Sequence, residues 1–263
     1  MNRLHSSQAC HGSADIQTSK GQLLELGSFA PTLLDGSPQA FFLPSRYEPN
    51  YRYPLIVWLH HQGGCEQQVA QVMPHISVQN YVGVGIRGTR ACDPGGHRFD
   101  WVHTGNGILQ AEQLVMDAIE QATERFSIHP ERIFLAGYRS GGVMAQRLGL
   151  MNPHRFAGVV SLGGGLPRGG RPLARLNSLR GFRLLLAQAI ESERFSLEQF
   201  EQDLRLINAA KLHVEVRQVT CEDEMIAPVL RHIDHWLMSL VTGQSLPESV
   251  PDWDTVPVEF SEN

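Results

Sequence analysis

The sequence has little of several features that would assign it to a specialised class of protein. Its four cysteines, Cys10, Cys65, Cys92 and Cys221, have an irregular spacing that does not resemble a dense disulfide framework. Lys and Arg number 22 against 27 Asp and Glu, so the net charge of -5 gives no support for nucleic-acid binding. No apolar run approaches the roughly 18 residues that span a bilayer. Residues 1–22 are polar and lack an apolar segment, so we expect no secretory signal and predict a cytoplasmic protein.

What the sequence does contain is a regular alternation of strand-like and helix-like patterns. Strands are expected over residues 40–44, 53–60, 81–86, 133–136, 157–162, 184–187 and 213–219. Helices are expected over residues 66–75, 111–126, 141–150, 196–210 and 228–240, with a long loop over 87–106. This alternation predicts an α/β fold with a mostly parallel sheet and helices on both faces. We predict one domain over residues 23–243, a flexible leader over 1–22 and a loosely held tail over 244–263.

The most informative stretch runs from Arg132 to Leu150, Arg-Ile-Phe-Leu-Ala-Gly-Tyr-Arg-Ser-Gly-Gly-Val-Met-Ala-Gln-Arg-Leu-Gly-Leu. An apolar strand leads into a helix through a sharp turn, which is the pattern of a nucleophile elbow. In that device, small residues two positions before and two after the tip let a strained backbone project one side chain above the sheet. Gly137 and Gly141 are the small residues here, so the tip is Arg139.

The order of elements from about residue 40 to residue 241 resembles the α/β-hydrolase superfamily, in particular its carboxylesterase/phospholipase and polyhydroxybutyrate-depolymerase-like branch. The segments that carry the resemblance are 54–60 (Pro-Leu-Ile-Val-Trp-Leu-His), 132–142, 155–162 (Arg-Phe-Ala-Gly-Val-Val-Ser-Leu) and 233–238 (Ile-Asp-His-Trp-Leu-Met). The resemblance implies an ester hydrolase with a triad of nucleophile, acid and histidine in that chain order.

The triad that the resemblance implies is chemically altered in this sequence. Its nucleophile position falls on Arg139, and a protonated guanidinium has no lone pair with which to attack a carbonyl. Its acid position falls near Ser192, where Glu191 or Glu193 is a candidate substitute. Its histidine position falls on Asp223, and an ionised aspartate is a poor base beside a serine. The resemblance thus implies a pseudoenzyme, with the fold of a hydrolase and without its expected catalytic groups.

The oxyanion loop that the resemblance implies also departs from its usual pattern. It falls on His61 and Gln62, together with the backbone of Ser140, and His61 stands where a glycine usually follows the preceding histidine. Ser140 as a substitute nucleophile would put Tyr138 at a position that needs a small residue. We therefore interpret the Ser140 hydroxyl as a cap for free N–H groups at the start of the helix.

Opposite charges are expected to face each other across this site. We predict an ion pair between Arg139 and a carboxylate, with Asp223 as the first choice and Glu191 or Glu193 as alternatives. One interpretation is a structural pair that fills an inactive pocket. The other is an anion site, in which Arg139 at a helix N-terminus holds a carboxylate or phosphate.

A second polar group falls in the long loop, where Cys92, Asp93, His97, Asp100 and His103 are close in sequence. Their spacing fits no standard zinc pattern, so we predict no metal and no other cofactor.

Two functions are compatible with this sequence. The first is a binding, regulatory or scaffold protein that takes a small anionic or ester ligand and has no identified protein partner. The second is a carboxylic ester hydrolase with a rearranged site that uses Ser140 or a cysteine, for which Cys65, Cys92 and Cys221 are the candidates near the same edge of the sheet.

Overall fold

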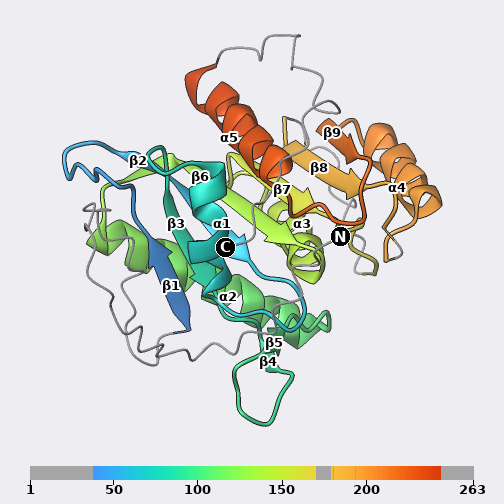
Figure 1. The fold of residues 1–263 in the computed structure, drawn as a ribbon, viewed down its shortest axis with the longest axis horizontal. Coiled ribbons are helices and arrows are strands. Elements are labelled where there is room, and N and C mark those ends of the chain that lie inside the picture. The colour runs from blue at the N-terminus through green and yellow to red at the C-terminus, as the bar shows by residue number, and fades with distance from the viewer. Residues whose placement is uncertain (1–37, 170–178, 180, 193, 244–263) are drawn as a thin grey trace, which may run out of the picture.

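The computed structural model describes residues 38–169, 179, 181–192 and 194–243. Within them, seven strands form one sheet in the order β1-β3-β2-β6-β7-β8-β9 (Figure 1). Their bounds are β1 Gln39–Phe42, β2 Tyr53–Leu59, β3 Val82–Ile86, β6 Ile128–Tyr138, β7 Gly158–Leu162, β8 Arg183–Ala189 and β9 His213–Val219. β1 pairs antiparallel with β3, and the other neighbouring strands pair in parallel. The predicted α/β fold with a mostly parallel sheet is confirmed.

Helices cover both faces of this sheet. Their bounds are α1 Gln68–Ile76, α2 Gly105–Arg125, α3 Ser140–Met151, α4 Leu197–Ala209 and α5 Ala227–Thr242. Residues of α2, α3 and α4 belong to one buried apolar cluster, and residues of α1 and α5 belong to the other. The sheet therefore forms the middle layer of three, which Figure 1 shows from one side.

The continuous apolar runs in the sequence reflect this double burial. In β2, Leu55, Val57 and Leu59 pack with the first cluster, and Ile56 and Trp58 pack with the second. Both sets are fully buried, because neither face of a central parallel strand meets solvent.

Several expected boundaries were wrong. α2 begins at Gly105 rather than at 111, because the Thr104 side chain accepts a hydrogen bond from the N–H of Gly107 and caps the helix there. The long loop over 87–106 contains a two-stranded ribbon, β4 Arg90–Ala91 and β5 Phe99–Asp100. β6 is longer than expected and begins at Ile128.

Other expectations hold or fall outside the described residues. The bounds of β9 agree with the expected strand, and α4, which lies within the helix expected over 196–210, begins with a capping box between Ser196 and Gln199. The predicted leader over 1–22 and tail over 244–263 lie outside the described residues.

Candidate functional site

The turn between β6 and α3 places Arg139 at its tip. Arg139 has φ 50° and ψ -113°, a backbone conformation that non-glycine residues rarely adopt. A Cβ atom on Gly137 would contact the backbone of Gly141, and a Cβ atom on Gly141 would overlap the carbonyl oxygens of Leu59 and His60. The two glycines therefore let the turn close tightly against the end of β2, which fixes the backbone from which the Arg139 side chain projects.

The Arg139 guanidinium binds Asp223, which lies in the loop after β9. Arg139 Nη2 donates to Asp223 Oδ2 at 3.1 Å. Asp223 Oδ1 accepts two further hydrogen bonds, from the hydroxyl of Tyr138 at 2.6 Å and from the N–H of Met225 at 2.8 Å. The guanidinium also lies over the Tyr138 ring, 4.7 Å from its centroid. Asp223 is therefore anchored by three donors, and only one of them is Arg139.

This ion pair is only partly shielded from solvent. The Arg139 side chain is 24% exposed and that of Asp223 is 45% exposed. At such exposure, an ion pair contributes about 1 kcal/mol or less to stability. Burial, and then the hydrogen bond to Asp223, raise the pKa of Tyr138, so its hydroxyl stays a proton donor at neutral pH. The pair fixes the position of the guanidinium more than it stabilises the fold.

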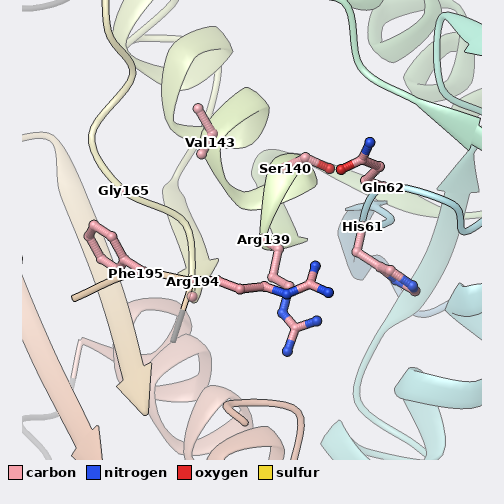
Figure 2. A pocket seen from close by; sticks show the side chains of 9 residues that line it. His61, Gln62, Arg139, Ser140, Val143, Gly165, Arg194 and Phe195 are labelled. Carbon is pink, nitrogen blue, oxygen red and sulfur yellow. The ribbon is translucent and has the colours of Figure 1, made fainter. Parts of the chain in front are cut away.

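A cavity of about 220 Å³ opens beside the start of α3 (Figure 2). Four loops at the carboxyl ends of neighbouring strands form its wall. The lining residues are His61 and Gln62 after β2, Arg139, Ser140 and Val143 at the start of α3, Gly163 and Gly165 after β7, and Arg194 and Phe195 after β8. The three residues predicted for the oxyanion loop thus line one cavity together with Arg139.

Ser140 lines this cavity, and no base lies beside its hydroxyl. Its Oγ is buried and has no hydrogen-bond partner among the described residues, so the interpretation of this hydroxyl as a helix cap was wrong. In Figure 2 the Ser140 side chain points toward Gln62, and the His61 ring extends away from it. A serine hydroxyl needs a hydrogen-bonded base to act as a nucleophile. Ser140 has the location of a reactive group and lacks that partner.

A chain of two hydrogen bonds, from Trp58 to Gln68 and from Gln68 to His61, fixes where the His61 proton lies. The indole N–H of Trp58 donates to Gln68 Oε1 at 2.9 Å, which leaves the amide nitrogen of Gln68 facing His61 Nδ1 at 2.8 Å. Because that nitrogen donates, Nδ1 accepts, and the proton of the neutral ring lies on Nε2. Burial, and then the positive charge of Arg139, lower the pKa of His61. Its Nδ1 lone pair is occupied, so His61 is a poor substitute for the missing base.

The preceding histidine braces the same loop. His60 Nε2 accepts from the N–H of Gly88 at 2.9 Å, so Nδ1 carries the proton and donates to the His61 carbonyl at 2.7 Å. The side chain is fully buried, and burial lowers its pKa to about 4. The carbonyl of His60 accepts from the indole N–H of Trp101 at 2.8 Å. His60 thus ties the oxyanion-type loop to the loop after β3.

Of the residues expected near the acid position, the two that the structure describes, Glu191 and Ser192, are not the partners of Arg139. Ser192 forms a turn in which its N–H donates to the carbonyl of Ala189 at 3.1 Å. Glu191 is exposed, and its N–H donates to the carbonyl of Cys221 at 3.2 Å. Glu193 lies outside the described residues. Arg139 therefore pairs with the first-choice partner, Asp223, and forms no ion pair with Glu191.

Glu224 is a buried carboxyl group that the sequence analysis did not single out. It is 1% exposed, and its Oε1 accepts from the N–H of Ala189 at 2.9 Å. Its Oε2 lies against Gly163 and has no hydrogen-bond partner among the described residues. Burial raises its pKa, which favours the neutral acid. The side chain joins the end of β8 to the loop after β9 and lies against Gly163, a residue of the cavity wall.

Arg194 and Phe195 were also missed as pocket residues. Both follow β8 and line the cavity. Their place after a strand at the ligand-binding edge was the signal that could have found them. The sequence did not say which side chains of that loop turn inward.

Of the three cysteines that the structure describes, Cys65 and Cys221 are unsuited to nucleophilic attack. Cys65 is buried and disulfide-bonded, which removes it as a nucleophile. Cys221 is a free thiol whose Sγ lies 2.9 Å from the carbonyl of Asp223, and burial raises its pKa. Cys92 is free and exposed on the β4–β5 ribbon side of the molecule. A raised pKa disfavours the thiolate that nucleophilic attack requires.

The polar loop around Cys92 does not form a metal site among the described residues. Across that part of the chain, no group of three His, Cys, Asp or Glu side chains is placed to hold a metal ion. Asp93 Oδ1 instead accepts from the N–H groups of His97 and Arg98, at 2.9 and 2.7 Å, and closes the loop. In the described chain, we also find no helix with the length and apolar character needed to cross a membrane.

Comparison with curated proteins finds esterases. Over 140 residues, 52% of this chain, the sequence is 29% identical to a protein described as "Probable feruloyl esterase C" from Aspergillus clavatus, covering 49% of it. Over 158 residues, 59% of this chain, it is 25% identical to "Putative esterase NocK" from Nocardia uniformis subsp. tsuyamanensis, covering 43% of it. The chain therefore spans about half the length of these relatives. No family model matches the sequence.

Comparison with solved structures agrees on the fold. A carboxylesterase from Mesorhizobium loti superposes with a TM-score of 0.64 at 16% identity, covering 79% of this chain and 98% of that one. A structure described as YahD with malic acid superposes with a TM-score of 0.59 at 14% identity, covering 77% of this chain and 98% of that one. The protein has an esterase-like α/β-hydrolase fold.

Proposed function

We propose that this protein is a pseudoenzyme of the α/β-hydrolase fold. It would bind a small ligand in the cavity beside α3, in a binding, regulatory or scaffold role, without Ser-His-Asp hydrolysis. The observation that carries the proposal is the guanidinium at the tip of the turn, where Arg139 has φ 50° and pairs with Asp223 at 3.1 Å. A cation that is already hydrogen-bonded to a carboxylate can orient an anion, and it cannot form an acyl intermediate.

The lack of a base beside the Ser140 hydroxyl supports the same proposal. Its hydroxyl has no hydrogen-bond partner among the described residues, and the nearest pocket histidine, His61, uses its lone pair on Gln68. General-base assistance typically contributes about 10²–10⁴-fold to rate. Without a general base, the rate of ester hydrolysis by a serine falls far below that of an ordinary esterase, even in a well-formed cavity.

The second candidate is hydrolysis of carboxylic esters by Ser140 in a rearranged site. The esterase names of the two curated relatives favour it, and Ser140 lines the cavity. This function requires a base that reaches Ser140 after a ligand binds. Malic acid in the YahD structure belongs to that protein, and it motivates testing carboxylic acids as ligands here.

A fluorophosphonate probe separates the two candidates. We expect no covalent labelling of the wild-type protein and no turnover of p-nitrophenyl acetate above that of Ser140→Ala, because no base activates the hydroxyl. Intact-mass spectrometry and absorbance at 405 nm measure the two outcomes. Labelling that disappears in Ser140→Ala would establish the hydrolase and end the pseudoenzyme proposal.

Rebuilding two triad positions is the converse experiment. We expect Arg139→Ser combined with Asp223→His to gain little esterase activity, because position 192 holds a serine in place of the acid that would orient the new histidine. A rise to ordinary esterase rates in the double variant would show that the remaining machinery is intact.

A cytoplasmic location is a further part of the proposal. The free thiols of Cys92 and Cys221 fit a reducing compartment, whereas the disulfide at Cys65 is unusual there. Alkylation in cells lysed directly into acid and denaturant, without reductant, tests this, because denaturation exposes the buried Cys65. Modification of Cys65 under these conditions supports the cytoplasm, and its protection would favour an oxidising compartment.

A further inference from the structure

We propose that the cavity beside α3 binds a small monocarboxylate with an apolar body, and that Asp223 competes internally with this ligand for Arg139. The inference rests on the proposed function, because it treats the cavity as a binding site. It adds the chemical class of the ligand and a residue that sets the affinity.

The charge of the cavity wall favours an anion. Arg139 and Arg194 both line it, and Figure 2 shows their side chains extending into the same region. Arg139 is paired with Asp223, whereas Arg194 is in no ion pair within the part of the chain that the structure describes. Among the described residues that line the cavity, none is acidic. Glu224 lies behind the wall, and burial raises its pKa toward the neutral form. Among the described residues, the wall thus carries one positive charge, that of Arg194, for which no ion pair is seen.

Neutral donors are available beside that charge. The Ser140 hydroxyl is buried, lines the cavity and has no partner among the described residues. Ser140 is the first residue of α3, a helix of 12 residues whose first N–H groups have no partner within the helix. A carboxylate oxygen accepts from a hydroxyl, from such N–H groups and from a guanidinium. The Ser140 hydroxyl is thus a donor for which the described residues provide no acceptor.

The rest of the wall fits an apolar group. Phe195 and Val143 line the cavity, and Gly163 and Gly165 leave it open on the β7 side. A Cβ atom on Gly165 would lie 2.8 Å from the Phe195 ring, so a side chain there would displace it. The volume of about 220 Å³ is below that of pockets for drug-sized ligands, which start at roughly 300 Å³. The site suits a small ligand with one charged end.

Asp223 can lose its ion pair with Arg139 and still be held in position by its other hydrogen bonds. After such an exchange, its Oδ1 still accepts from the Tyr138 hydroxyl at 2.6 Å and from the N–H of Met225 at 2.8 Å. At 45% exposure its Oδ2 is accessible to water as a replacement partner. A ligand carboxylate and Asp223 would therefore compete for the same guanidinium, which makes the affinity depend on the charge of a residue outside the cavity lining.

Titration with benzoate, followed by ¹H–¹⁵N NMR at fixed ionic strength, tests the inference. We expect wild-type protein to bind benzoate and not benzamide, its neutral counterpart. Arg194→Gln should weaken benzoate binding at least fivefold, because it removes the uncompensated charge. Asp223→Asn should tighten it at least threefold, because the amide releases Arg139 and its oxygen still accepts from Tyr138. Arg205→Gln, on a side chain of α4 that is 79% exposed, is the matched control and should change nothing.

Each outcome decides the inference. Benzoate binding that Arg194→Gln leaves unchanged, or weaker binding in Asp223→Asn, would overturn it, provided that the variants keep the wild-type circular dichroism spectrum. Inorganic phosphate that binds as tightly as benzoate would show an anion site without an apolar requirement and would also overturn it. Failure of benzoate to bind, with no fluorophosphonate labelling, refutes this inference and leaves the pseudoenzyme proposal standing. Labelling at Ser140 refutes the pseudoenzyme proposal itself, and with it the inference that depends on it.

Discussion

Replacing Gly141 with alanine is expected to destabilise the protein by about 3 kcal/mol or more. An alanine Cβ would overlap the carbonyl oxygens of Leu59 and His60, which belong to the backbone at the end of β2 and cannot turn away as a side chain would. Overpacking of a well-packed core typically costs about 1–3 kcal/mol, and it costs more where only backbone can move. The free energy of unfolding in urea, measured by circular dichroism, gives the change directly.

A glycine in an open position provides the control for this substitution. Gly105 is the first residue of α2, and nothing lies within 4 Å of the position that its Cβ would take. Gly105→Ala should change stability by no more than about 1 kcal/mol, and in the stabilising direction, because alanine favours helix. If Gly141→Ala were as stable as Gly105→Ala, the start of α3 could not pack as closely on the end of β2 as the structure shows.

Stability is expected to fall by about 3 kcal/mol between pH 6.5 and pH 4 because of His60. Burial lowers its pKa from 6.5 to about 4, so the unfolded chain binds this proton and the folded protein does not. The stabilisation is fully present above pH 6.5 and is lost progressively as the pH falls toward 4. The pKa values of His61 and His103 are also lowered by burial, and they add to the same trend.

Unfolding in urea at several pH values between 4.5 and 7.5 measures this dependence. His60→Gln removes the titrating group and keeps one side-chain acceptor for the N–H of Gly88, so the loss of stability over this range should shrink. His154→Gln, at an exposed position, is the matched control and should reproduce the wild-type slope. A full wild-type slope in His60→Gln would assign the pH dependence to other groups.

The fold could be predicted because its signals are local. Strands buried on both faces are continuous apolar runs, and β2 and β9 have bounds close to those expected from the sequence. The early start of α2 could not be predicted from apolar spacing, because its first turn is fixed by a polar cap at Thr104. The β4–β5 ribbon has only two residues in each strand, which is too short for an alternating pattern to show in the sequence.

The site could be predicted in part for a similar reason. A turn of glycines around Arg139 is a sequence motif, and the strand order brings the loop after β9 near the same edge of the sheet. The direction of a loop side chain depends on packing with other loops. Glu224 and Asp223 are neighbours in sequence, yet one is buried behind the cavity and the other is nearly half exposed. The sequence alone does not show which of these two acidic side chains is buried.

The contact of Gln68 with Trp58 has a consequence for the chemistry of His61. An amide has one accepting and one donating atom, so the indole of Trp58 indirectly selects the imidazole tautomer two contacts away. A carboxylate in its place, as in Gln68→Glu, would accept from both neighbours and draw the imidazole proton to Nδ1. The Nε2 lone pair would then be free, and ¹⁵N chemical shifts of the ring would report the exchange. The choice between an amide nitrogen and a carboxylate oxygen at position 68 thus decides whether Nε2 of His61 donates or accepts a hydrogen bond.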